Sequence, residues 1–171
     1  MLLNEPDQDW EKIGRKGPYF GVLRHPQYRT RSLTDAAREQ FFQSGEARIR
    51  TVIDTVAKRL GVELRPRRAL DFGCGVGRLL IPLARLSGEA TGIDISDSMR
   101  AEAQRNCEAR GVGNVRVARD LSALEGSYDF IHSHIVFQHM KVARGEAAFA
   151  QLLGRLAPGG IGVVHFTYAK S

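Results

Sequence analysis

The chain has 171 residues, of which 43% are hydrophobic and 26% are charged, as is ordinary for one soluble globular domain. No apolar run approaches the roughly 20 residues of a membrane span, and the N-terminal sequence is acidic where a signal peptide is basic and then apolar. We therefore expect a cytoplasmic protein with no membrane partner. The net charge is +6, but aromatic residues do not interleave with the basic ones as a nucleic-acid platform requires, so a nucleic-acid partner is not expected.

Residues 1–62 are expected to form an N-terminal loop and helical segment that caps the fold. Residues 1–31 are rich in Pro and Gly and are expected to be mostly loop, yet they hold enough apolar area to pack against a core. Residues 32–61 repeat apolar side chains at helical spacing, and Gly61 is a suitable residue to end this helix. Ser44 and Gly45 are expected to split the helix in two.

From residue 63 to residue 171 the pattern changes to short apolar strands that alternate with helices, which defines a second segment. Strands are expected at residues 67–72, 89–96, 115–120, 128–135 and 161–168, helices at 77–87, 96–111 and 145–157, and a turn at 158–160. Such alternation predicts right-handed βαβ units in a doubly wound α/β sandwich of three layers with a mainly parallel sheet. Ligands of such folds bind at the carboxyl ends of the strands.

A glycine-rich turn, within the stretch ALDFGCGVGR at residues 69–78, follows the first of these strands. A dinucleotide fingerprint, G-x-G-x-x-G, would place its third glycine at position 78, which is Arg78. Asp71 precedes the turn and is a poor neighbour for a pyrophosphate. A carboxylate there suits a ligand with a cationic end, such as an α-amino group or a sulfonium. An NAD-dependent oxidoreductase is therefore disfavoured.

Two more acidic residues follow the next two strands. Asp94 is placed to accept hydrogen bonds from both hydroxyls of a ribose. Asp120, together with the backbone N–H of Leu121, is placed to recognise the edge of an adenine, and Ile95 and Met99 supply apolar faces for the ring. Each acid also has a simpler interpretation, as a turn cap, a helix cap or a surface carboxylate. Three such coincidences at one sheet edge favour a ligand site.

With these residues in place, the chain resembles the class I S-adenosylmethionine-dependent methyltransferases from about residue 69 to residue 166. The segments that carry the resemblance are LDFGCGVGR, TGIDISDSM, VARDLSAL, YDFIHSHIVFQHM and LLGRLAPGGIGVVHF. The resemblance implies a Rossmann-like fold with strand order 3-2-1-4-5, and an enzyme that uses S-adenosylmethionine and releases S-adenosylhomocysteine. It also implies a cofactor site of Asp71, Gly73, Cys74, Gly75, Gly77, Asp94, Ile95, Met99, Asp120, Leu121 and His134.

Histidines after the fourth strand are candidates for chemistry. His139 lies where the mouth of the site is expected, and the ordinary pKa of a histidine, about 6.5, suits a general base. The alternative is that His139 only donates or accepts a hydrogen bond. His132 and His134 share one face of the strand, and with Asp129 they raise the question of a metal. Three ligands on one strand make poor geometry, so no metal is expected.

Aromatic residues of the N-terminal segment are expected to form a lid over the site. Tyr19, Phe20, Phe41 and Phe42 are the candidates, because a sulfonium is attracted to ring faces. Packing in the core is the alternative for Phe41 and Phe42. As neighbours on a helix the two rings cannot point the same way, so one is expected to pack and the other to cover.

The expected acceptor is a small molecule, a sugar or a secondary metabolite, methylated on oxygen or nitrogen. Motifs for methylating adenine amines, C5 of cytosine and protein arginine are absent from the sequence. The alternatives are an inactive S-adenosylmethionine-binding module with a regulatory or assembly role, or a fragment of a larger methyltransferase. The sequence ends after the fifth strand, where the family usually adds two more strands. We therefore expect either a missing C-terminal region or a partner chain, as in a homodimer, to cover that sheet edge.

Overall fold

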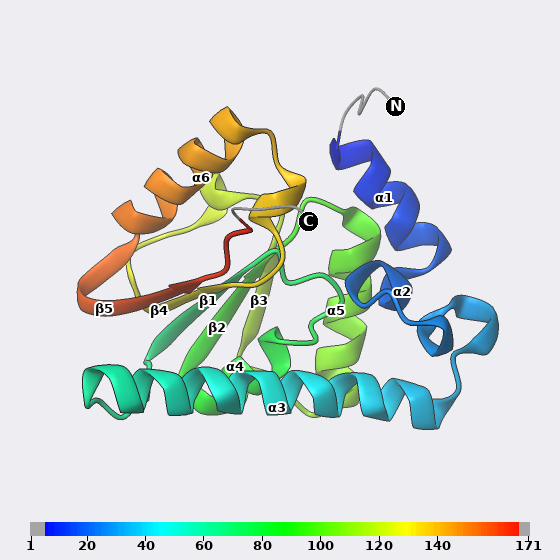
Figure 1. Ribbon diagram of the computed structural model, residues 1–171, viewed down its shortest axis with the longest axis horizontal. Coiled ribbons are helices and arrows are strands. Elements are labelled where there is room, and N and C mark those ends of the chain that lie inside the picture. The colour runs from blue at the N-terminus through cyan, green and yellow to red at the C-terminus, as the bar shows by residue number, and fades with distance from the viewer. Residues whose placement is uncertain (1–5, 168–171) are drawn as a thin grey trace.

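The computed structural model describes residues 6–167 and is built around one parallel sheet of five strands (Figure 1). The strands are β1 (Arg68–Phe72), β2 (Glu89–Ile93), β3 (Val115–Ala118), β4 (Tyr128–Ser133) and β5 (Leu156–Val164). Their order in the sheet is β3-β2-β1-β4-β5. The predicted α/β class and the strand order 3-2-1-4-5 are confirmed.

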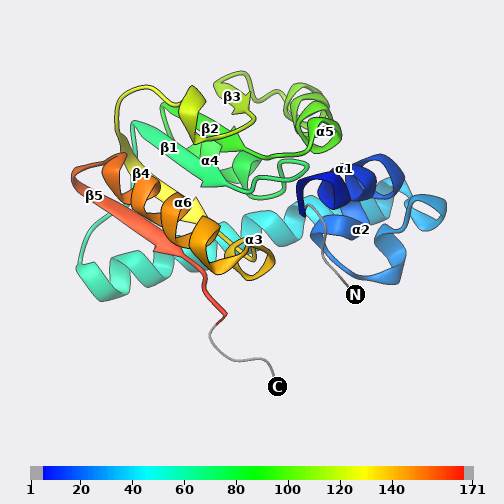
Figure 2. The same cartoon turned by 90° about the horizontal axis from the view of Figure 1, so that it is seen from above.

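Helices cover both faces of the sheet and complete the three layers. One face carries α3 (Asp35–Leu60), α4 (Leu80–Leu86) and α5 (Asp97–Ala109), and the other carries α6 (Val142–Gly154). Figure 1 shows α3 running beneath the strands and α6 above them. In the view from above, α1 (Pro6–Lys16) and α2 (Pro18–Val22) lie beside α5 at one end of the molecule (Figure 2).

The central strands β1 and β4 are buried on both sides because each side packs against a helical layer. Along β1, Ala69 belongs to the hydrophobic cluster between the sheet and helices α3 and α4. The next residue, Leu70, belongs to the cluster between the sheet and α6. Phe130 and Ile131 of β4 divide between the two clusters in the same way. A parallel sheet buried on both faces produces the short, continuous apolar runs seen in the sequence.

The expectation that residues 1–31 are mostly loop is wrong, because α1 and α2 lie within them. Their prolines stand at helix starts, Pro6 in α1 and Pro18 in α2, where proline is tolerated. Gly14 lies inside α1, and a glycine is needed there because a Cβ at this position would lie 2.6 Å from the Ser96 hydroxyl. The prolines that predicted a loop therefore begin α1 and α2, and Gly14 lets α1 pack closely on the start of α5.

The expected break at Ser44 and Gly45 is also wrong, because α3 is one continuous helix of 26 residues. Gly45 packs against the turn before α4, and a Cβ at this position would lie 2.1 Å from the backbone oxygen of Arg78. The glycine is needed for that close approach. At the other end of the helix Gly61 adopts φ +67° and ends it as expected.

The expected turn at 158–160 is not a separate turn but lies inside β5. Gly159 adopts φ +76° there, and the pairing with β4 shifts register between Tyr128 and Phe130, as at a bulge. Tyr168, the last residue of the expected fifth strand, lies outside the described residues. Covering of the β5 edge by further chain or by a partner stays a prediction. Between residues 6 and 167 no helix is long and apolar enough to cross a membrane.

Candidate functional site

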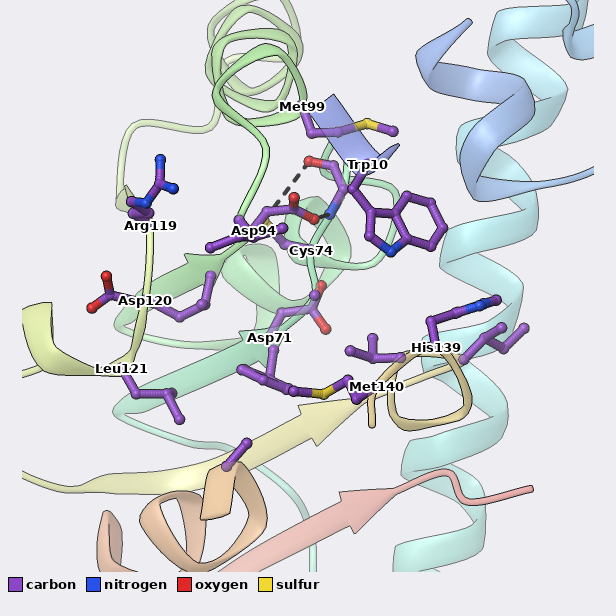
Figure 3. Close-up of a pocket in the computed structure, with 18 of the residues that line it drawn as sticks. Trp10, Asp71, Cys74, Asp94, Met99, Arg119, Asp120, Leu121, His139 and Met140 are labelled. Carbon is purple, nitrogen blue, oxygen red and sulfur yellow. Dashed lines mark hydrogen bonds between the residues drawn. The ribbon is translucent and has the colours of Figure 1, made fainter. Parts of the chain in front are cut away.

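A cavity of about 530 Å³ opens at the carboxyl ends of the strands (Figure 3). Every residue that the sequence assigned to a cofactor lines it, except Gly77. Gly77 instead faces α5, where a Cβ would lie 3.6 Å from Ala103. In Figure 3, Asp71 and Asp94 lie between Trp10 and His139 on one side and Asp120 on the other. The fold therefore brings together the acids that lie at the end of β1 and just after β2 and β3.

The glycine turn brings backbone, rather than side chains, to the cavity wall. Gly73 adopts φ +80° and Gly75 φ +52°, both in the left-handed region that favours glycine. A Cβ on Gly73 would lie 2.2 Å from Val136, which follows β4. The backbone N–H groups of Gly73 and Cys74 both donate to the carbonyl of Ile93, at 2.7 and 2.9 Å. These contacts tie the turn to the ends of β2 and β4.

Asp94 is held by two backbone N–H groups. Its Oδ2 accepts from Gly75 at 2.8 Å and its Oδ1 from Ser96 at 3.0 Å. Burial raises the pKa of Asp94 above its ordinary value, and these hydrogen bonds oppose that rise. The helix cap of α5 is Ser96 and not Asp94, since the Ser96 hydroxyl accepts from Met99. Each carboxylate oxygen of Asp94 still has a second lone pair for a ligand.

Asp120 lies at the edge of the cavity and is exposed. Its Oδ1 accepts from the backbone N–H of Ser122 at 3.0 Å and from the Ser122 hydroxyl at 2.5 Å. These hydrogen bonds lower the pKa of Asp120, which therefore stays ionised. The next residue, Leu121, is buried against the apolar cluster beneath α6. Asp120 thus also meets its simpler interpretation, as a surface carboxylate, and in addition it caps the short turn at 121–123.

Asp71 is buried and pairs with a histidine of the neighbouring strand. The Nδ1 of His132 lies 2.9 Å from Asp71 Oδ1, and both side chains are almost fully buried. Because a carboxylate only accepts, His132 donates in this pair. Asp129 lies away from it and accepts from the backbone of Arg68. Within residues 6–167, no three His, Cys, Asp or Glu side chains are grouped so as to hold a metal ion.

His139 lines the cavity at the end of a short helical turn, Phe137–His139. Its ring meets the Trp10 ring edge to face, with centroids 5.1 Å apart. Its Nε2 lies 3.2 Å from Nε2 of Gln138. Ile135, between β4 and this turn, adopts φ +61°, which is a strained conformation for a β-branched residue. The loop that presents His139 therefore holds local strain beside the cavity.

The four aromatic residues expected to form a lid do not line the cavity. Phe41 and Phe42 are both buried in the core, so the expectation that one of them covers the site is wrong. The Tyr19 hydroxyl instead donates to Glu102 at 2.6 Å, and the Phe20 ring lies beneath Arg29. Both Phe41 and Phe42 are buried because the Tyr19 ring packs edge to face on each of them and all three belong to the same hydrophobic cluster.

Helix α1 supplies the covering residues that sequence reasoning missed. Trp10 and Asp7 line the cavity, and Asp7 pairs with Arg144 of α6 at 2.5 Å. Glu11 accepts from the hydroxyls of Ser96 and Ser98, at 2.7 and 2.6 Å, at the start of α5. These partners lie more than 80 residues away in the sequence. No local pattern in the sequence predicts these contacts. The only local signal is that Trp10 is a large apolar residue in a segment rich in Pro and Gly.

We expect Glu11→Gln to loosen α1. Hydrogen bonds from Ser98 and Ser96 lower the pKa of Glu11 from 4.5 to about 2. A carboxyl with a lowered pKa in the folded state contributes stability above about pH 4.5, and this contribution is lost as the pH falls toward 2. The difference in free energy of unfolding between wild type and Glu11→Gln, measured by urea denaturation, should be constant from pH 7 to 5 and shrink below pH 4. A difference that does not change with pH would show that the Glu11 charge does not hold α1.

Comparison with known proteins adds the following findings. The sequence profile of a family described as "Methyltransferase domain" matches residues 69–160, which is more than half of the chain. A 23S rRNA (uracil(1939)-C(5))-methyltransferase of Burkholderia thailandensis is 31% identical over 109 residues, covering 62% of this chain and 23% of the relative. A magnesium-protoporphyrin O-methyltransferase of Synechocystis sp. is 38% identical over 85 residues, covering 48% of this chain and 37% of the relative.

Among solved structures, magnesium protoporphyrin IX methyltransferase from Synechocystis PCC 6803, with bound S-adenosylmethionine, shares the fold. Its TM-score is 0.62 at 24% identity, over 91% of this chain and 74% of that one. The present chain spans less than a quarter of the length of the rRNA methyltransferase. The similarity to both curated relatives extends over only part of their length.

Proposed function

This chain belongs to the methyltransferase domain family, and from that premise we propose that it binds S-adenosylmethionine in the cavity and methylates an oxygen or nitrogen of a small-molecule acceptor. The observation that carries the proposal is the set of carboxylates in or just after β1, β2 and β3, around a turn whose glycines bring backbone to the cavity wall. An acidic wall of this kind suits a ligand that bears a positively charged sulfonium and hydrogen-bond donors. It does not suit a pyrophosphate.

The described residues fit this cofactor in size and chemistry. A cavity of about 530 Å³ lies within the usual range for small-molecule sites, roughly 300–1,000 Å³. We assign the ribose to Asp94, whose carboxyl oxygens are already oriented by backbone N–H groups. The adenine edge is assigned to Asp120 with the backbone N–H of Leu121, and its ring faces to Ile95 and Met99. The amino acid end is assigned to the glycine turn and Asp71. S-adenosylmethionine, when bound, supplies a methyl group on a positively charged sulfur.

The remaining tasks of the chain are to orient the acceptor, to exclude water and to take a proton. Trp10 and helix α1 cover the cavity and reduce access of water. We assign proton removal to His139, which lies on the same wall as Trp10. Since a general base of this kind contributes about 10²–10⁴-fold to the rate, His139 is expected to matter most for a hydroxyl acceptor.

The low reactivity of the two cysteine thiols favours methylation of an oxygen or nitrogen over methylation of C5 of a pyrimidine. Carbon C5 becomes nucleophilic when a thiolate adds to the ring, so a reactive cysteine would be needed. Burial, with the nearby Asp94 and Asp71 carboxylates, raises the pKa of the Cys74 thiol well above its ordinary value. Burial also raises the pKa of Cys107 to about 11, and this residue does not line the cavity. Neither described thiol is suited to that chemistry, although one relative is named for it.

The test is transfer of a radiolabelled methyl group from S-adenosylmethionine to a panel of hydroxylated and amino compounds. We expect transfer to at least one of them, and a fall in kcat of about 10²–10⁴-fold in His139→Gln with little change in cofactor affinity. His25→Gln, which replaces an exposed histidine, should leave kcat unchanged. If the protein binds the cofactor but transfers methyl neither to any of these compounds nor to an RNA oligonucleotide, an inactive binding module is favoured. Transfer only to the RNA would overturn the small-molecule acceptor.

A further inference from the structure

His132 is an almost fully buried histidine near the end of β4, with 1% of its surface exposed. Strands β1 and β4 are parallel neighbours whose register places Asp71 opposite His132, so the two side chains lie on the same face of the sheet. On that face the His132 ring lies nearly parallel to the Phe130 ring, with 6.3 Å between the centroids. The strand register and this neighbouring ring hold the imidazole in place.

The imidazole is directed at the carboxylate of Asp71. Its Nδ1 donates to Asp71 Oδ1 at 2.9 Å, and among residues 6–167 this is the one hydrogen bond that the carboxylate accepts. Asp71 lines the cavity and lies between Asp94 and Met140 in Figure 3, whereas His132 does not line it. His132 therefore contacts Asp71 from the core, and Oδ2 is the oxygen that stays available to a ligand.

A hydrogen bond from the core acts on both the charge and the orientation of a buried carboxylate. It favours the ionised form and fixes the side chain in one rotamer, whereas burial without a partner favours the neutral carboxyl. Burial, and to a smaller extent the charge of Asp71, raise the pKa of Asp94, so two carboxylates repel each other on this wall. Arg78 attracts Asp71 by charge. Of the described groups, however, only His132 contacts the Asp71 carboxylate through a hydrogen bond.

We propose that His132 is a positioning residue for the methyl donor, because its Nδ1–H holds Asp71 so that Oδ2 accepts from the α-amino group of the bound cofactor. This inference rests on the proposed function, which assigns the amino acid end of the cofactor to Asp71 and the glycine turn. The simpler interpretation is that the pair only satisfies two buried polar groups. In that case the loss of His132 would affect all ligands of the cavity equally.

Isothermal titration of the full chain with two ligands separates these interpretations. The ligands are S-adenosylhomocysteine and deamino-S-adenosylhomocysteine, which lacks only the α-amino group. We expect His132→Leu to bind S-adenosylhomocysteine at least about tenfold more weakly than wild type, and to bind the deamino analogue within about threefold of wild type. His132→Phe, which keeps a ring beside Phe130 but has no donor, serves as the second variant if His132→Leu does not fold.

Rescue by a conservative substitution is the next expected result. The amide nitrogen of asparagine can take the place of Nδ1, so His132→Asn should bind S-adenosylhomocysteine within about threefold of wild type. Ser133→Ala is the matched control, because the buried Ser133 hydroxyl also donates from β4 to β1, at 3.0 Å to the carbonyl of Phe72. It should leave the ratio of the two affinities at the wild-type value.

The proposal is overturned if His132→Leu weakens both ligands by the same factor, or weakens neither. Asp71→Asn separates a failure of the proposal from a failure of the proposed function. If Asp71→Asn removes the preference for S-adenosylhomocysteine over the deamino analogue while His132→Leu keeps it, the positioning role fails and the cofactor assignment stands. If wild type binds neither ligand, the proposed function fails and the positioning role fails with it.

Discussion

Replacing Asp94 with alanine is expected to lower the affinity for S-adenosylhomocysteine by about 100-fold or more. The half-buried carboxylate is oriented by the backbone N–H groups of Gly75 and Ser96, and we assign both ribose hydroxyls to it. A hydrogen bond to a charged group contributes about 1.5–3 kcal/mol, and every 1.4 kcal/mol is a tenfold change in affinity. Isothermal titration of wild type and variant measures the loss.

Asp97→Ala provides the control for this experiment. Asp97 is an exposed acid in the first turn of α5, three residues from Asp94, and it does not line the cavity. Its removal changes the net charge by the same amount, so the affinity should stay within about threefold of wild type. An Asp94→Ala protein that folds and binds as tightly as wild type would show that the ribose assignment is wrong.

Gly45→Ala is expected to destabilise the protein, although alanine is the better helix former by about 1 kcal/mol. The added Cβ would lie 2.1 Å from the backbone oxygen of Arg78, so α3 must move away from the turn that begins the cavity wall. Overpacking of this kind costs about 1–3 kcal/mol, and here the neighbour is rigid backbone. The free energy of unfolding from urea denaturation should therefore fall.

Gly154→Ala is the matched substitution with the opposite expected sign. Gly154 is the last residue of α6, and a Cβ there meets no other atom within 4 Å. Helix propensity alone should then raise the free energy of unfolding, by up to about 1 kcal/mol. If Gly45→Ala stabilises the protein as Gly154→Ala does, the close contact between α3 and the Arg78 turn is not present in solution.

The parallel sheet and its acidic edge could be predicted because their signals are local. The central strands are short apolar runs such as Ala69 to Phe72, buried on both faces, and Asp71, Asp94 and Asp120 lie in or just after strands. The wrong expectations about where helices begin and break concern glycines and prolines, whereas the wrong lid assignment concerns aromatic residues. Gly14 and Gly45 indicate breaks when only the sequence is considered, whereas the structure uses them for close contacts between helices.

The rest of the site depends on segments that meet only in the folded chain. Trp10 reaches the cavity because Glu11 holds α1 on α5, through hydrogen bonds that span more than 80 residues. Arg48 of α3 and His134, which follows β4, likewise meet only in the folded chain, with Nη2 and Nδ1 3.3 Å apart. Each of these residues is ordinary in its own stretch of sequence. Their contacts are visible only in three dimensions.

The most direct test of the central claim is titration of the wild-type chain with S-adenosylhomocysteine and, separately, with NAD. The claim is that the acidic edge around the glycine turn holds the methyl donor and its product rather than a dinucleotide. We predict saturable binding of S-adenosylhomocysteine with one site per chain, and no binding of NAD at the same concentrations. Binding of NAD without binding of S-adenosylhomocysteine would contradict the account.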